Sequence, residues 1–371
     1  MFIKKNALKQ NLLILLSLAT ILITIGLIFI YSSSSVYAAQ RMGSSFYYLK
    51  KQLAGCSIGI ICFFSIWIIP LSLLQKLSPF LFLVSLSLTA CTLLPVLGLT
   101  IHGSSRWINF GLIAGQPSEL LKIFFILYIA YFFAKRINKP FQIQSTYVPF
   151  FIIVGVTSFI LLRQPDFGLA VTLSSTALMM FFIAGLPLFH LFITTCSIVP
   201  LVALLILKKA YRLKRILVFL DPWKDPQGSG FQIIQSLIAV GSGSWFGCGI
   251  SHSKQKLFYL PMQHTDFIFS IIAEETGLVG SISIICLYLL FLYYGIKIAT
   301  DLTTPFFYFT TIGFTLLISL QAFINIFVTI GLLPTKGIGL PLISYGNSSL
   351  ISTIVMIGII ARMATHEYKK S

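Results

Sequence analysis

The chain has 371 residues, of which 57% are hydrophobic and only 9% are charged, and its mean hydropathy is +0.95. This composition excludes an ordinary soluble domain, in which roughly a quarter of the residues are charged, and a disordered chain, which needs low hydrophobicity. The 26 basic and 9 acidic residues give a net charge of +17. Because many cations lie beside apolar runs, we expect them to contact anionic headgroups and polyprenyl phosphates, and no nucleic-acid partner is expected.

Ten apolar runs follow one another along the chain, and a run of about 20 residues is long enough to cross a bilayer as a helix. The runs cover residues 11–31, 53–74, 79–101, 119–134, 147–162, 167–186, 188–207, 267–298, 305–333 and 348–364. We therefore predict an all-α polytopic membrane protein with about ten transmembrane helices. No soluble domain boundary or fixed repeat is evident, so residues 1–371 are expected to form a single integral membrane domain.

The charge pattern of the loops predicts the orientation. An even number of crossings places both termini on one side of the membrane, and Lys and Arg in short loops favour the cytoplasmic side. With a cytoplasmic N-terminus, the inner segments hold eleven basic residues and the short outer loops hold six. Both termini are therefore predicted to be cytoplasmic. The N-terminal run has no small-residue cleavage site, so we expect it to be retained as the first span.

The predicted outer segment between the seventh and eighth helices, residues 208–266, is called here the long loop. It begins with the basic amphipathic stretch KKAYRLKRIL and later contains the apolar segment GFQIIQSLIAV. That segment is too short to span a membrane and is expected to lie at the interface or to re-enter. Between them, Asp221 and Asp225 are flanked by Pro and are expected in turns. Smaller outer loops are predicted at residues 102–118 and 334–348.

Acidic residues beside membrane spans are expensive, so the few present are candidates for function. Asp166, before the sixth run, is expected to cap a helix N-terminus. Glu119 and Lys122 are three residues apart at a helix start and predict an i, i+3 ion pair. Glu274 and Glu275 are expected to be buried partners of cations such as Lys122, in preference to a proton relay.

Asp266 occurs in KLFYLPMQHTDFIFSII, where the long loop meets the eighth predicted helix, two residues after His264. Thr265 or Asp266 could cap that helix. A carboxylate at the membrane surface could also act as a general base on a hydroxyl delivered from the membrane. The local sequence leaves both roles open, although a cap hydrogen bond would lower the pKa and weaken the base.

The remaining polar motifs are less specific by themselves. Arg106 and Trp107, in HGSSRWINFG, are typical of an interfacial anchor. Lys336 lies in LLPTKGIGLPLISYGNSSL, which predicts either a re-entrant loop or a turn. No nucleotide-binding loop, Ser/His/Asp motif or paired Asp metal motif occurs, so ATP coupling and a metal-dependent sugar-nucleotide enzyme are disfavoured. Five of the six cysteines lie in apolar runs, and their spacing suggests neither disulfides nor a zinc site.

Several motifs together resemble one known family. HGSSRWINFG with QPSELLK, QPDFG, FLDPWKDPQGSGFQIIQSLIAVGSG, QKLFYLP with HTDFIF and AEE, and GLLPTKG with LISYG occur in the order seen in the SEDS family of shape, elongation, division and sporulation proteins. The resemblance covers nearly the whole chain. The stretches YRLKRILVFLDPWKDPQGSGFQ and QKLFYLP are more similar to the division members than to the elongation members.

The resemblance implies a ten-helix peptidoglycan glycosyltransferase that polymerises lipid II at the outer face of the cytoplasmic membrane, for septal wall synthesis in division. The implied partners are lipid II and polyprenyl-linked glycan, a class B penicillin-binding protein and other division proteins. The Asp of the family's HTDF motif is its proposed catalytic residue, and Asp266 stands at that position. The candidate substrate-binding residues are Arg106, Trp107, Glu119, Lys122, His264 and Lys336.

The implied reaction is an inverting glycosyl transfer. Asp266 would deprotonate the C4 hydroxyl of the acceptor GlcNAc, which attacks C1 of the donor MurNAc and expels a polyprenyl pyrophosphate. Arg106, Lys122, Lys336 or the basic run 208–215 would stabilise the leaving group, with a divalent cation as the one candidate cofactor.

Two alternatives are a lipid II flippase and an elongation-type polymerase. An ion-coupled transporter would need paired acids near the bilayer midplane, which only Glu274 and Glu275 offer.

The chain departs from the family pattern at three positions. The family usually has Glu where Met262 stands, Pro where Gly339 stands and Gly where Asn347 stands. The first departure removes a supporting acid, so Asp266 is expected to work alone or with Glu119. The other two are expected to affect loop rigidity more than chemistry.

Overall fold

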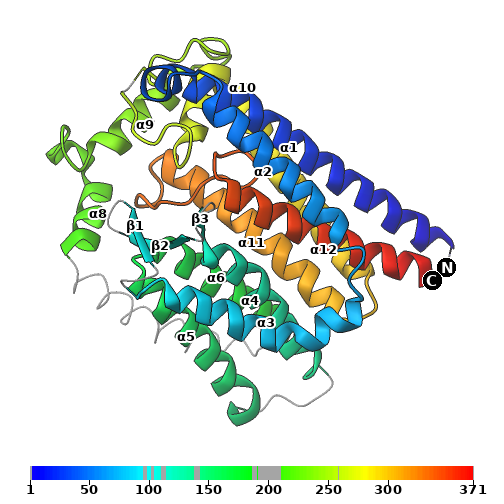
Figure 1. Ribbon diagram of the computed structural model, residues 1–371. Helices are drawn as coiled ribbons and strands as arrows, with labels where there is room; N and C mark the ends of the chain where they lie inside the picture. The colour runs from blue at the N-terminus through cyan, green and yellow to red at the C-terminus, as the bar shows by residue number, and fades with distance from the viewer. Residues whose placement is uncertain are drawn as a thin grey trace.

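The structure is a computed structural model that describes residues 2–94, 98–101, 104–109, 114–137, 143–185, 190, 210–257 and 259–370. Within these residues the chain is mostly α-helical (Figure 1). The helices are α1 (Phe2–Met42), α2 (Tyr47–Ser65), α3 (Leu71–Cys91), α4 (Pro117–Ala134), α5 (Val148–Arg163), α6 (Phe167–Ile183), α8 (Ala210–Leu220), α9 (Phe231–Ser242), α10 (Ile268–Asp301), α11 (Pro305–Thr329) and α12 (Asn347–Lys370). A π-helical turn (Ile143–Tyr147) precedes α5, and a 3₁₀ helix (Pro222–Lys224) follows α8.

The described helices confirm a polytopic membrane protein. Seven of them, α1, α3, α4, α5 with its π-helical turn, α10, α11 and α12, are long and apolar enough to cross a membrane. The helices α2 and α6 match two further predicted runs, and α6 has only 17 residues. The predicted span at 188–207 lies outside the described residues except for His190.

Two predicted runs end differently in the structure. The run 53–74 is divided because α2 ends at Ser65 and α3 begins after Pro70, whose ring restricts the backbone of the residue before it. The end of the run 79–101 forms strand β1 (Gly98–Ile101), which pairs antiparallel with β2 (Ser104–Asn109), and β2 pairs antiparallel with β3 (Ala114–Gly115). This small sheet adds to the predicted helical fold and places Arg106 and Trp107 on its central strand.

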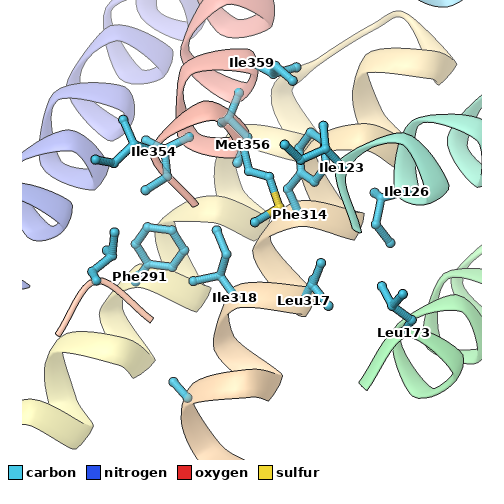
Figure 2. Close-up of a cluster of buried hydrophobic side chains, with 14 of the residues drawn as sticks. Ile123, Ile126, Leu173, Phe291, Phe314, Leu317, Ile318, Ile354, Met356 and Ile359 are labelled. Atoms are coloured by element: carbon cyan, nitrogen blue, oxygen red, sulfur yellow. The ribbon is translucent and has the colours of Figure 1, made fainter. Parts of the chain in front are cut away.

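Helix α11 lies in the middle of the bundle, and its neighbours α4, α6, α10 and α12 pack around it (Figure 1). Figure 2 shows the apolar core that they share. Its labelled side chains are Ile123 and Ile126 of α4, Leu173 of α6, Phe291 of α10, Phe314, Leu317 and Ile318 of α11, and Ile354, Met356 and Ile359 of α12. Since interiors of this kind are close-packed, α11 is a rigid support for the residues at its ends.

Both termini lie at one end of the bundle, as an even number of crossings requires, and the small sheet, α8 and α9 lie at the opposite end (Figure 1). We call that opposite end the distal end. The cytoplasmic placement of the termini stays a prediction, supported by the loop charges.

The long loop is partly helical at the distal end. Its predicted first residues, 208 and 209, lie outside the described residues. The apolar segment predicted to be too short to span forms α9, which has 12 residues. Ser236 of α9 shares a 2.6 Å hydrogen bond with Ser270 of α10 and donates another, also 2.6 Å, to the carbonyl of Thr329 at the end of α11. These bonds fix α9 against two core helices. Asp225 is confirmed as a turn residue, since it accepts bonds from the amide and hydroxyl of Ser229.

Candidate active site

Asp266 lies at the distal end, two residues before α10 begins. The capping interpretation is not supported, because Phe267 is the N-cap residue of α10 and no side chain caps that helix. The Thr265 hydroxyl donates instead to the carbonyl of Met262, at 3.2 Å. The Asp266 carboxylate accepts no hydrogen bond from any described residue, and the residue is partly exposed. A carboxylate in this state has its lone pairs available for an external proton.

The surroundings of Asp266 make its carboxylate a stronger base than an ordinary one. Burial raises the pKa of Asp266 from 3.8 to about 6. The guanidinium groups of Arg106 and Arg215 oppose part of this rise, and the carboxylate of Asp166 adds to it. At pH 7 the group is mostly ionised, and its pKa is closer to the operating pH, as general base catalysis favours.

Arg106 connects the central strand β2 to the start of α6. Its Nη2 donates a 2.6 Å hydrogen bond to the Pro165 carbonyl, and its Nε lies 3.4 Å from Oδ2 of Asp166. Asp166 is confirmed as the N-cap of α6, because its Oδ1 accepts a 3.1 Å hydrogen bond from the amide of Leu169. Arg106 is therefore held at the start of α6, and from that position its positive charge lowers the pKa of Asp266.

The loop between α11 and α12, residues 330–346, is called here the α11–α12 loop. Lys336 lies with its Nζ 5.3 Å from the ring centroid of Phe167, and burial lowers the pKa of Lys336. Ile338 packs directly on Gly168, where an added Cβ would lie 2.7 Å from the Ile338 Cγ1. Gly168 is required for this close approach, which brings the loop onto the N-terminus of α6. A Cβ on Gly337 would lie 3.5 Å from Oδ2 of Asp266, so the same loop also borders the candidate base.

The predicted pair of Glu119 and Lys122 is confirmed, with Lys122 Nζ 2.6 Å from Glu119 Oε2. Glu119 also accepts a 2.6 Å hydrogen bond from the hydroxyl of Ser352 on α12. Lys122 is only 1% exposed. Glu119 raises the pKa of Asp166 and Lys122 lowers it, which places both charges on the same side of the bundle as Asp166. Their place in the structure indicates a buried link between α4 and α12, and contact with substrate stays a prediction.

His264 packs in an aromatic cluster. Its ring centroid lies 4.4 Å from that of Tyr48, 5.7 Å from that of Tyr345 and 5.8 Å from that of Tyr37. Burial lowers the pKa of His264 to about 4, so the ring is neutral at pH 7. This favours a packing role for His264. Trp107 pairs with Leu99 across β1 and β2 and is partly exposed.

Glu274 and Glu275 are both buried. Glu275 is paired with a cation, as predicted, but the cation is Lys256 and not Lys122, and Glu274 has hydroxyl and amide partners instead. The Lys256 Nζ lies 3.1 Å from Oε1 of Glu275, which also accepts a 2.7 Å hydrogen bond from the hydroxyl of Ser32. Glu274 accepts from the hydroxyl of Ser253 and from the amide of Lys254, the latter at 3.0 Å. The cluster fastens the long loop to α10 and α1. Lys256 gave no sequence signal, because it lies in a polar stretch that resembles an exposed loop.

Two further site residues are Arg215, which the sequence indicates only as part of the basic run 208–215, and Asn325, which local sequence reasoning does not single out. Arg215 belongs to the predicted basic run, and its Nη1 donates a 3.2 Å hydrogen bond to the carbonyl of Thr335 in the α11–α12 loop. Asn325 is a polar residue near the end of α11, and only the structure shows what it contacts. Among the described residues no group of three or more His, Cys, Asp or Glu side chains is arranged to hold a metal ion. The divalent cation therefore stays a prediction, with no ligand set assigned among the residues that the structure describes.

Comparisons with known proteins give one family. The cell cycle protein family of FtsW, RodA and SpoVE matches residues 11–369. Over 353 residues the chain is 40% identical to the probable peptidoglycan glycosyltransferase FtsW of Geobacter sp., covering 95% of this chain and 96% of that protein. Over 355 residues it is 38% identical to the stage V sporulation protein E of Bacillus subtilis, covering 95% of this chain and 97% of that one.

Two solved structures have the same fold. One is a chain from work on the structural coordination of polymerization and crosslinking by a peptidoglycan synthase complex. It matches with a TM-score of 0.79 and 29% identity, covering 96% of this chain and 98% of that chain. The other is the rod shape determining protein RodA of Thermus thermophilus, with a TM-score of 0.70 and 25% identity, covering 95% of this chain and 96% of that one.

Proposed function

The chain belongs to the cell cycle protein family of FtsW, RodA and SpoVE, and we propose that it is a peptidoglycan glycosyltransferase that polymerises lipid II for cell division. Relatives named as probable peptidoglycan glycosyltransferases, at 40% identity over nearly the full length, support the activity. The observation that carries the mechanism is the Asp266 carboxylate, which is partly exposed, is not hydrogen-bonded to any described residue and has its pKa raised to about 6.

In the proposed reaction Asp266 takes the proton from the C4 hydroxyl of the acceptor GlcNAc. The oxygen then attacks C1 of the donor MurNAc, the bond from C1 to the pyrophosphate breaks, and the configuration at C1 inverts. The leaving pyrophosphate gains negative charge, which positioned cations stabilise. Arg106, Arg215 and Lys336 supply three positive charges at the distal end, of which Arg106 is paired with Asp166.

The proposal includes a location and a partner. The distal end would face the outside of the cytoplasmic membrane, since the termini lie at the opposite end and the loop charges favour a cytoplasmic N-terminus. A class B penicillin-binding protein would supply the crosslinking activity, supported by the fold shared with a chain of a peptidoglycan synthase complex. Septal placement and other division partners are supported by the FtsW-named relatives.

The test uses purified protein reconstituted with lipid II on the accessible side, with and without the partner, and scores glycan strands. Asp266→Asn should reduce polymerisation by about 10² to 10⁴-fold, the usual contribution of a general base. The matched control is Asp221→Asn, the same chemical change at a 44% exposed side chain of the long loop, which should leave the rate unchanged. Near-normal product from Asp266→Asn would remove Asp266 from the mechanism. Translocation of lipid II by the wild type without any glycan product would support the flippase instead.

A further inference from the structure

Asn325 occupies an unusual position at the distal end of α11. Its side chain is buried, with 2% of the residue exposed. Its Nδ2 donates one hydrogen bond to the backbone carbonyl of Asp266 and another to the carbonyl of Ile338, both 2.7 Å long. An amide nitrogen carries two hydrogens, so both bonds form at the same time. One side chain of the central helix therefore binds the segment of the candidate base and the α11–α12 loop.

The backbone carbonyls of the two residues before Asp266 also accept hydrogen bonds. The carbonyl of His264 accepts a 2.9 Å bond from the amide of Tyr345, and the carbonyl of Thr265 accepts a 2.6 Å bond from the hydroxyl of Ser344. Tyr345 and Ser344 both belong to the α11–α12 loop. Asn325 is the member of this set that comes from a core helix, so it connects the loop and the Asp266 segment to the rigid part of the fold.

The second hydrogen bond of Asn325 holds the part of the α11–α12 loop that faces the Asp266 carboxylate. Ile338, whose carbonyl accepts that bond, packs on Gly168 beside the Asp166 cap, and its amide donates a 3.0 Å bond to the carbonyl of Lys336. Gly337, which borders the Asp266 carboxylate, lies between these two residues. Asn325 thus bonds both to the segment of the candidate base and to the loop that carries Lys336.

We propose that Asn325 is a positioning residue for the glycosyl transfer, which holds Asp266 at a set distance from the cationic α11–α12 loop. The proposal depends on the proposed role of Asp266 as the base. A displacement of about 1 Å in a reacting group can lower a rate by about 10²-fold, and accurate placement needs support from buried hydrogen bonds. A single amide that bonds both segments at 2.7 Å supplies that support.

The test compares Asn325→Leu, which has a similar volume and no donor, with Gln321→Leu. Gln321 lies one helical turn earlier on α11 and donates a 3.2 Å bond to the carbonyl of Gly339, so it is hydrogen-bonded to the same loop, and among the described residues its side-chain amide has no hydrogen bond to the Asp266 segment. Polymerisation is measured over pH 4.5 to 8 with lipid II, and hydrogen exchange of residues 262–268 is measured on the same intact proteins.

Asn325→Leu should lower kcat by at least about 10-fold, with the KM for lipid II changed by less than about 3-fold. Its acid limb should move below pH 6 toward the ordinary Asp value, because a released carboxylate can move into water, and residues 262–268 should exchange faster. Gln321→Leu should keep the acid limb near pH 6. If Asn325→Leu does not fold, Asn325→Ser replaces it, since a single hydroxyl hydrogen can hold only one of the two carbonyls.

The outcomes separate this inference from the proposed function. If Asp266→Asn is inactive while the Asn325 variant matches Gln321→Leu in kcat, acid limb and exchange, the positioning role is overturned and the function stands. If Asp266→Asn polymerises normally, Asp266 is not the base, and the positioning role of Asn325 that depends on it fails as well. The proposed polymerase function fails only if the wild type makes no glycan strands.

Discussion

Replacing Asp266 with Asn is expected to stabilise the fold while it removes the activity. Burial raises the pKa of Asp266 from 3.8 to about 6, a rise of about two units. One unit corresponds to about 1.4 kcal/mol, so keeping this carboxylate ionised costs the folded state about 3 kcal/mol at pH 7. Asn has nearly the same shape and no charge, so the variant avoids this cost. A catalytic carboxylate kept ionised in a buried position lowers the stability of the fold while it provides the activity.

The sign of the pH dependence follows from the direction of the shift. The folded-state pKa of Asp266 lies above the unfolded value, so the folded protein binds the proton more tightly. The stabilisation from this carboxyl is therefore fully present below about pH 4 and is lost as the pH rises to about 6. The unfolding temperature of Asp266→Asn should exceed that of the wild type by roughly 5 °C at pH 7.5 and should approach it at pH 4.5.

The assay is thermal unfolding of the purified protein in detergent at the two pH values. Unfolding of a membrane protein is often irreversible, so the scan rate is kept constant and only differences between variants are compared. Asp221→Asn, which removes a surface carboxylate 3.8 Å from Lys224, serves as the control and should change neither unfolding temperature. An Asp266→Asn protein that unfolds at the same or a lower temperature than wild type at pH 7.5 would refute the reasoning.

Two further predictions use matched pairs of variants. Lys256→Met leaves the buried carboxylate of Glu275 without its cation and should destabilise the fold by about 3 to 5 kcal/mol, whereas Lys214→Met removes an exposed pair and should leave the unfolding temperature nearly unchanged. Gly168→Ala places a Cβ 2.7 Å from the Ile338 side chain and should lower polymerisation several-fold in a folded protein, whereas Gly155→Ala meets nothing within 4 Å and should be neutral; equal rates for the two would contradict the packing argument.

The features that the sequence predicted correctly depend on neighbouring residues. A span depends on the apolar content of one run, and seven of the described helices meet that requirement. The Asp166 cap and the pair of Glu119 and Lys122 each join residues three positions apart. Helix geometry fixes such contacts once the helix start is known.

The features that were missed join segments that are distant in the chain. The bond from Ser32 to Glu275 crosses 243 positions, and the bond from Asn325 to Asp266 crosses 59. Hydrophobic periodicity contains no information about such pairs. Lys256 is 4% exposed, although its surroundings in the sequence are polar. The short strands were missed because β1 and β2 continue an apolar run and its polar end, without a period long enough to separate strand from helix.

The family usually has Glu where Met262 stands, but the absence of that Glu does not mean that Asp266 needs another acidic side chain in its place. The Met262 side chain is 41% exposed, and its backbone, at a φ of 55°, accepts the amides of Thr265 and Phe267 at 3.1 and 3.4 Å. Its contribution to the turn before α10 therefore comes from the main chain. Glu119, the other candidate helper, is already bonded to Lys122 and to the Ser352 hydroxyl.

The charges that act on Asp266 are then two guanidinium groups, Arg106 and Arg215, and the carboxylate of Asp166, which has its own partner in Arg106. Two carboxyls sharing one proton would need to lie in contact, and their protons would leave in two coupled steps. Asp166 instead caps α6 through the amide of Leu169. The arrangement favours a single base whose proton affinity is raised by burial and limited by the two arginines, so the acid limb of the rate should follow one ionisation.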